Sequence, residues 1–264
     1  MRIITYILTM LLLLACKNND GVNDIPFETI TADKTISLSS EEHAPSCRVH
    51  LKLESATSKA GHIGELINET VIKKFLDPHG EKDMKIAAEK FISTYTDNYK
   101  KTMQPLYNQD RNDASKRFWY EYHYILEATT QKGTDNTITY LTTIDYYEGG
   151  AHGINQQQIL NFDSRTGLLL TLKDIFVSGY EQPLKDLLLK ALLSKTGCKN
   201  IRALRTKGYL SSMDIFPTEN FILGSETITF IYNPSEIAPY SMGATQLVIP
   251  YSDLDKLIKN TIDL

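Results

Sequence analysis

Two neighbouring segments of alternating residues constrain the fold most, because a period of two is the geometry of a β-strand. From Arg117 to Ala128 the side chains alternate between an aromatic face and a face that carries most of the charge. From Thr137 to Tyr147 the alternation returns, and the segment between the two contains Gly133 and Asp135, residues typical of turns. The two segments therefore predict an antiparallel hairpin.

The charged face of the first of these strands carries Glu121, His123 and Glu127. Such a row could hold a metal ion or perform catalysis. The solvated face of an antiparallel sheet presents the same residue types, however, and we favour that interpretation.

Helical periodicity appears in three segments. Apolar residues fall at helical intervals over 62–76 and again over 84–103, where Pro105 is expected to stop the helix. A leucine stripe lies between Tyr180 and Thr196, with Gly197 just past its end. We expect short strands over 49–54, 155–162, 168–172, 219–223, 226–232 and 246–250, an unpatterned connection over 201–212, and a short final helix after Ser252. The fold class is therefore α+β: an N-terminal part with helices against strands, then an antiparallel sheet covered by the 184–192 helix.

The N-terminus resembles the signal peptide of bacterial lipoproteins. Arg2 precedes an apolar run from Ile3 to Leu14, and Ala15 stands directly before Cys16. The run is shorter than the roughly 20 residues of a transmembrane helix. The resemblance implies that Cys16 is acylated and anchors an extracytoplasmic protein to a membrane, in the periplasm or at the cell surface. Residues 17–45 are polar and lack a period, so we expect a flexible tether.

Charge and cysteine content narrow the partners and the chemistry. The part after Ala15 has 27 basic and 32 acidic residues, a formal charge of −5 without a basic patch, so nucleic acid is not an expected partner. Cys47 and Cys198 remain after Cys16, and they could form a disulfide or be two separate buried thiols. Cysteine and histidine spacing indicates no zinc site, and no cofactor is expected.

The sequence YYEGGAHG, Tyr146 to Gly153, interrupts two strand-like runs with three glycines and a histidine. One hypothesis is a ligand pocket that gathers aromatic rings and carboxylates, as recognition of a sugar or a protein loop requires. Its residues would be Tyr146, Tyr147, Glu148, Gly149, Gly150, His152, Gly153, Glu236 and Tyr240. The alternative is that His152 bonds locally and the glycines permit a bulge or crossover.

Three segments together resemble a known family. They are YYEGGAHG with the following NFDSRTGLLLTLKDIF (Asn161 to Phe176), NPSEIAPYSMG (Asn233 to Gly243) and LVIPYSDL (Leu247 to Leu254). The pattern is similar to the C-terminal domain of extracytoplasmic anti-sigma factors that sense lysozyme, which many bacterial lipoproteins share. The region from Cys47 to Asp145 resembles the small domain that precedes it, which is also found ahead of the catalytic domain of some peptidoglycan deacetylases. The expected organisation is a signal peptide over 1–16, a tether over 17–45, an N-terminal α+β domain over 46–145 and a C-terminal α+β domain over 146–264.

The resemblance implies a lipid-anchored binding or sensing protein of the cell envelope, with a lysozyme-like hydrolase or peptidoglycan as its ligand. The sigma-factor-binding segment and the deacetylase catalytic domain are not expected here. The chain has no GxSxG motif, and no metal-ligand spacing surrounds His152. We therefore expect no catalysis. The alternative is an envelope enzyme or accessory factor acting on peptidoglycan glycan, with His152 as acid or base.

Overall fold

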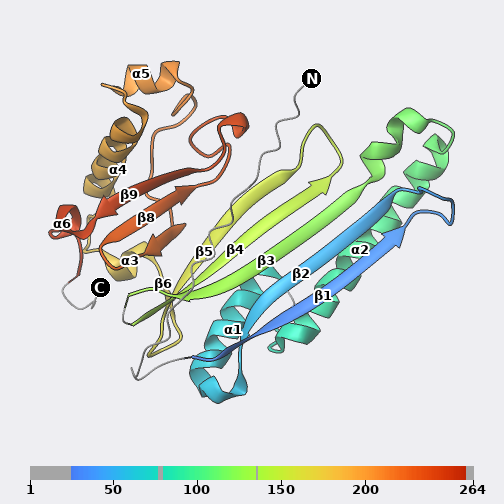
Figure 1. Cartoon of the computed structure of the whole chain (residues 1–264), viewed down its shortest axis with the longest axis horizontal. Coiled ribbons are helices and arrows are strands. Elements are labelled where there is room, and N and C mark those ends of the chain that lie inside the picture. Colours follow the sequence, from blue (N-terminus) through green and yellow to red (C-terminus); the bar gives the residue numbers. More distant parts are fainter. Residues whose placement is uncertain (1–24, 77–79, 135, 260–264) are drawn as a thin grey trace, which may run out of the picture.

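The computed structural model describes residues 25–76, 80–134 and 136–259, which form two parts with separate hydrophobic cores. The expected signal peptide, Cys16 and the first residues of the expected tether lie outside these ranges. A six-stranded sheet with two long helices forms the first part, and a three-stranded sheet with its own helices forms the second beside it (Figure 1). The α+β prediction is confirmed.

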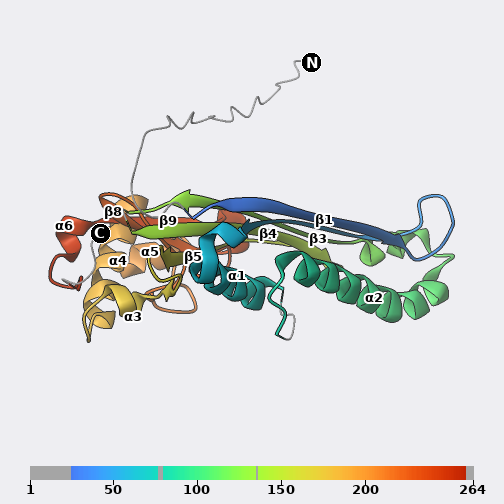
Figure 2. The same ribbon diagram turned by 90° about the horizontal axis from the view of Figure 1, so that it is seen from below.

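The larger sheet has its strands in chain order: β1 (Phe27–Ser37), β2 (Ser46–Ala56), β3 (Tyr122–Lys132), β4 (Thr137–Glu148), β5 (Ile154–Asp163) and β6 (Leu169–Leu170). All neighbours pair antiparallel except β2 and β3, which are parallel. A parallel pair needs a long crossover, and α1 (Gly61–Phe75), α2 (Met84–Asp110) and the 3-10 helix η2 (Ala114–Tyr120) supply it. Both long helices lie on one side of the sheet (Figure 2).

The first core lies between that side of the sheet and the two helices. Val49, Leu51 and Leu53 of β2 are fully buried against it, which agrees with the strand alternation predicted there. From α1, Ile67 and Val71 enter the same core, because residues four apart share one helix face. The predicted 137–147 strand and its hairpin with β3 are confirmed.

The second part continues the chain from residue 172. It contains α3 (Leu172–Ile175), α4 (Glu181–Thr196), α5 (Ile201–Thr206), β7 (Phe221–Leu223), β8 (Thr227–Tyr232), the 3-10 helix η3 (Tyr240–Met242), β9 (Thr245–Pro250) and α6 (Tyr251–Leu254). The strands form an antiparallel sheet in the order β7-β8-β9. Leu184, Leu188 and Leu192 of α4 are fully buried in the core of this part, and Gly197 ends the helix with a φ of 67°, both as predicted. None of the helices within the described ranges is long and apolar enough to cross a bilayer.

Several predicted boundaries are wrong. The tether expected over 17–45 contains β1, because Ile30, Ala32 and Ile36 alternate with polar residues and pair with β2. The apolar alternation is weak in the sequence because Lys34 stands on the same face, and in the structure the residues of this face are only half-buried. The boundary expected at residue 146 falls inside β4, and the two cores divide between β6 and α3.

Three smaller differences concern helices. α2 continues through Pro105 to Asp110. Pro105 lacks a backbone N–H donor, but its absence does not end this helix. Residues 114–120 form η2, so the strand predicted from Arg117 begins only at Tyr122. Part of the expected connection over 201–212 is the short helix α5, which Asn200 caps by accepting a hydrogen bond from the Ala203 N–H (2.9 Å).

Cys47 and Cys198 are free, buried thiols in different cores, so the alternative of two separate thiols holds. Burial, and secondarily the charge of Glu148, raises the pKa of the Cys47 thiol to about 12. Cys47 is therefore protonated near neutral pH and packs as a small apolar side chain.

Candidate functional site

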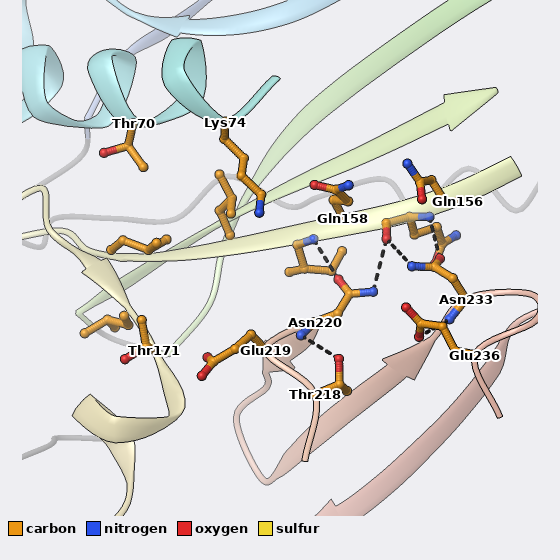
Figure 3. Close-up of a pocket in the computed structure, with 15 residues that line it drawn as sticks. Thr70, Lys74, Gln156, Gln158, Thr171, Thr218, Glu219, Asn220, Asn233 and Glu236 are labelled. Atoms are coloured by element: carbon orange, nitrogen blue, oxygen red, sulfur yellow. Dashed lines mark hydrogen bonds between the residues drawn. The ribbon is translucent and has the colours of Figure 1, made fainter. Parts of the chain in front are cut away.

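A pocket of about 400 Å³ lies at the junction of the two parts (Figure 3). Its walls come from α1, β5, β6, the start of α3 and the loops before β7 and after β8. We call it the junction pocket. Its polar lining residues are Thr70, Lys74, Gln156, Gln157, Gln158, Thr171, Thr218, Glu219, Asn220, Asn233 and Glu236.

Two asparagines of the second part bind the open edge of β5. β6 covers this edge only at Asn161 and Phe162. Beyond it, the Asn220 side chain accepts from the Ile159 N–H (2.8 Å) and donates to the Gln157 carbonyl (3.1 Å). The Asn233 side chain accepts from the Gln157 N–H (2.7 Å) and donates to the same carbonyl (3.0 Å). Side-chain amides thus take the place of a neighbouring strand and fix one wall of the pocket.

A third asparagine joins the two parts from the opposite direction. Asn161 of β5 is 1% exposed, and its Nδ2 donates to the Phe221 carbonyl at 2.8 Å. Its Oδ1 accepts from the Thr139 hydroxyl at 3.0 Å. Because this amide is buried and bonded on both sides, it orients β7 against β5.

The two carboxylates of the pocket each bind a backbone N–H. Glu219 accepts from the Leu172 N–H (2.9 Å), next to the Thr171 and Asp174 capping box that begins α3. Glu236 accepts from the Asn233 N–H (2.7 Å) and so holds the loop after β8. Both side chains therefore have a structural task before any ligand arrives.

Among the other polar groups at the junction pocket, Lys74 and the Gln158 amide oxygen have no partner among the described residues. Lys74 extends from α1 toward β5, and its ammonium makes no ion pair or hydrogen bond there (Figure 3). The buried Oε1 of Gln158 accepts no hydrogen bond from the described chain. An unsatisfied buried acceptor carries a desolvation cost that a ligand donor would remove. Together with the side chains of Gln156 and Gln157, which make no hydrogen bond within the described ranges, these groups are left for a ligand.

The nine residues of the predicted pocket do not meet in one site. His152 and Tyr240 do come together, with rings stacked 4.6 Å apart at 20°. Glu236 lines the junction pocket. Tyr146 stacks on Tyr124 on the helix-covered side of the sheet, whereas Tyr147 stacks on His123 on the opposite side. Adjacent strand residues point to opposite faces, so this pair could not line one pocket.

Local hydrogen bonds hold the bend formed by the YYEGGAHG segment, where β4 passes into β5. The His152 Nδ1–H donates to the Gly153 carbonyl (2.9 Å), and the Tyr147 hydroxyl donates to the Gly150 carbonyl (2.9 Å). Gly149 has a φ of 80°, and a Cβ there would lie 2.9 Å from the Trp119 carbonyl oxygen. The glycine therefore permits a left-handed turn and a close backbone approach. The geometry matches the alternative in which His152 bonds locally.

The side chains of the predicted charged row, Glu121, His123 and Glu127, have separate partners. Glu121 accepts from the Ser46 N–H (3.0 Å), the His123 Nε2 lies 3.7 Å from the Asp145 carboxylate, and Glu127 lies 3.7 Å from the His50 Nε2. In the portion of the chain that the structure describes, no three His, Cys, Asp or Glu side chains are grouped to hold a metal ion.

Sequence reasoning missed most of the junction pocket. Lys74 lies on the polar side of a predicted helix, where a lysine is expected in any case. Asn233 belongs to the NPSEIAPYSMG segment, but its partner Gln157 is 76 positions away along the chain. No local pattern shows such a contact. The nearest available signal is the run of amides from Asn155 to Gln158, which is unusual in a strand.

Comparisons with known proteins place this fold in a family. Residues 173–252 match DUF3298, a family of proteins of unknown function, so the match begins within α3. The crystal structure of a DUF3298 family member from Bacteroides fragilis NCTC 9343 is 30% identical, with a TM-score of 0.84 over 91% of this chain and 96% of that chain. The chain belongs to the DUF3298 family.

A second DUF3298 family structure, from Pseudomonas aeruginosa PAO1, shares the fold. It is 19% identical, with a TM-score of 0.61 over 91% of this chain and 97% of that chain. No curated protein matches the chain. Because both crystal structures span both parts, the association of the two sheets is a property of the fold and not of this chain alone.

Proposed function

We propose that this DUF3298 protein is a lipid-anchored binding or sensing protein of the cell envelope without catalytic activity, and that its ligand binds in the junction pocket. The anchor is the acylated Cys16, which makes the protein extracytoplasmic. The resemblance of the second part to the C-terminal domain of lysozyme-sensing anti-sigma factors supports a sensing role. So does the resemblance of the first part to the domain that precedes the catalytic domain in some peptidoglycan deacetylases.

The observation that carries the proposal is that some polar groups of the junction pocket bind the backbone, whereas others have no hydrogen-bond partner. The asparagine amides and both carboxylates hold backbone groups, while Lys74 and Gln158 have no partner within the described ranges. The pocket therefore offers a cation and an acceptor beside a partly apolar wall that includes Leu169 and Leu170. A small polar ligand that carries a carboxylate and donor groups fits this set. A peptidoglycan fragment has both, so we favour it over a lysozyme-like hydrolase.

The same arrangement argues against an enzyme. Among the described residues, no histidine, cysteine or serine lines the pocket, and its carboxylates accept hydrogen bonds from backbone N–H groups. Nucleophilic catalysis needs an activated nucleophile next to a base, and general acid catalysis needs a group free to exchange a proton with the substrate. His152 does not line the pocket either.

Calorimetric titration of the full chain with purified muropeptides, and separately with lysozyme, tests the ligand. We expect muropeptide binding that weakens on the order of tenfold in Lys74→Met, because a charged hydrogen bond is lost. Lys73→Met is the matched control, since Lys73 is also exposed on α1 but does not line the pocket. Equal binding by all three proteins would refute the site. Binding of lysozyme but not of muropeptides would move the function to protein recognition.

Two further measurements test the remaining parts of the proposal. Incubation with peptidoglycan should yield no new product by chromatography, and a product that disappears in His152→Ala would establish the enzymatic alternative. Metabolic labelling with a clickable palmitate analogue should mark the wild-type protein and not Cys16→Ser. Labelling that persists in Cys16→Ser would contradict the anchor.

A further inference from the structure

A second cleft, of about 220 Å³, opens between α2 and the ends of β3 and β4. Its lining residues are Tyr95, Asn98, Tyr99, Thr102, Met103, Tyr122 and Glu148. We call it the tyrosine cleft. It shares no residue with the junction pocket. The strand register places it at the end of the sheet where β1 finishes, since Ile36 pairs with Cys47, Cys47 with Tyr122, and Tyr122 with Glu148.

The carboxylate of Glu148 is the only charged group among the described residues that line this cleft. It accepts a hydrogen bond from the Tyr95 hydroxyl at 2.6 Å. It makes no ion pair with any lysine, arginine or histidine in the described ranges. Burial, followed by this hydrogen bond, raises the pKa of Tyr95, so the phenol stays a neutral donor. The cleft therefore keeps one negative charge without a counterion.

The other walls are aromatic rings and a thioether. The rings of Tyr99 and Tyr122 lie 5.0 Å apart, and the Tyr122 hydroxyl donates to the Met103 sulfur at 3.6 Å. Tyr99 is fixed because its hydroxyl donates to the Tyr120 carbonyl at 2.7 Å. Aromatic rings and a polarisable sulfur beside an unpaired carboxylate stabilise an organic cation. An anionic ligand would be repelled, and a neutral one would leave the carboxylate unpaired.

Two exposed aromatic residues lie near the cleft, where the Trp119 backbone approaches Gly149, the residue after Glu148. Phe118 and Trp119 of η2 are 54% and 55% exposed and pack edge to face, with ring centroids 5.7 Å apart. Gly149 follows Glu148 and lies close to both Trp119 and the cleft. A Cβ at this position would lie 2.9 Å from the Trp119 carbonyl oxygen and 3.8 Å from the Tyr122 ring. Exposed apolar residues beside a charged cleft are typical of a protein-binding surface.

We propose that the tyrosine cleft binds the side-chain ammonium of a lysine on a protein partner, with Glu148 as the counterion and Phe118 and Trp119 as the apolar rim. The carboxylate of Glu148 favours a cation by charge complementarity. The exposed Phe118 and Trp119 offer apolar contact area that a protein can cover and a free amine cannot. The site is independent of the junction pocket, so either proposal can fail alone.

The test titrates the full chain with a lysine-centred decapeptide and with the same peptide carrying norleucine, which has a similar chain without charge. The single tryptophan, Trp119, reports binding by fluorescence, and calorimetry gives the affinity. We expect the lysine peptide to bind and Glu148→Gln to weaken binding on the order of tenfold or more. Glutamine can still accept the Tyr95 hydrogen bond, so the fold should persist.

Three controls distinguish the loss of the Glu148 charge from other charge changes, from unfolding, and from binding of a free amine. Glu28→Gln removes one exposed carboxylate of β1 that does not line the cleft, and it should bind the peptide like the wild type. Unfolding temperatures verify that Glu148→Gln is folded. Equal binding of both peptides, no binding of either, or unchanged binding by folded Glu148→Gln would overturn the proposal. Binding of free N-acetyl-lysine amide as tightly as the peptide would overturn the protein source.

Discussion

At the junction pocket, amides from one part of the chain complete the hydrogen bonds of the other part. In the tyrosine cleft, a single carboxylate has one neutral donor and no counterion in the described chain. The first arrangement serves stability as well as binding, since removing an amide leaves backbone groups unpaired. The second arrangement contributes little to the fold, because its charge is not compensated inside the protein. The difference predicts that junction substitutions change stability and that substitution of Glu148 changes recognition.

Asn161→Ala should have the largest effect on stability. The substitution leaves the Phe221 carbonyl and the buried Thr139 hydroxyl without their partner, which should cost about 3 kcal/mol of unfolding free energy. Urea unfolding measures the loss. Asn155→Ala, at an exposed position on the same strand, is the control and should change little. A loss for Asn161→Ala as small as that of the control would mean that the two parts are not joined through this amide.

Gly149→Ala tests the bend at the other end of the sheet. The residue must adopt a φ of 80° and its Cβ would press on the Trp119 carbonyl, so we expect a loss of about 2 kcal/mol. Gly179→Ala has nearly the same φ, 83°, but open space around its Cβ, and should lose only about 1 kcal/mol. Thermal unfolding of the pair isolates the close approach. Equal losses would show that Trp119 does not restrict the bend.

Asn220→Ala and Asn233→Ala should each cost about 1 to 2 kcal/mol and expose the edge of β5. Hydrogen exchange should accelerate at the Ile159 amide in the first variant and at the Gln157 amide in the second. Because both side chains donate to the Gln157 carbonyl, each single variant leaves this carbonyl one donor, and the double variant, which leaves it none, should lose more than the sum of the single losses. Full additivity, or unchanged exchange, would contradict a shared edge contact.

Asp163→Asn, at the turn between β5 and β6, should have a smaller, pH-dependent effect. The hydrogen bond from the Arg165 side chain, opposed by burial, lowers the pKa of the Asp163 carboxyl. A depressed folded-state pKa stabilises the protein above the unfolded-state pKa, about 3.9, and this contribution is lost as the pH falls through the folded-state pKa. The variant should be less stable by about 1 kcal/mol at pH 7. In acid the difference should vanish, and a difference that persists at pH 2 would contradict this assignment.

Elements with a strong local period could be predicted from the sequence. The leucine stripe and Gly197 define α4, and the alternation of β3 and β4 defines their hairpin. β1 was missed because its residues are only half-buried, and their burial depends on pairing with β2. The alternation of strand residues also decides against the predicted pocket, since Tyr146 and Tyr147 must face opposite sides of β4. The junction pocket depends on contacts such as Gln157 with Asn233, which only the folded chain creates.

Hydrogen exchange of the full chain with each ligand bound tests the separation of the two regions most directly. Saturating muropeptide should slow exchange over 156–160 and 218–220 and leave 95–103 and 146–149 unchanged. The lysine peptide should do the reverse. Protection of the tyrosine cleft by muropeptide, or protection of neither region, would contradict a binding protein whose ligand lies at the junction of its two parts.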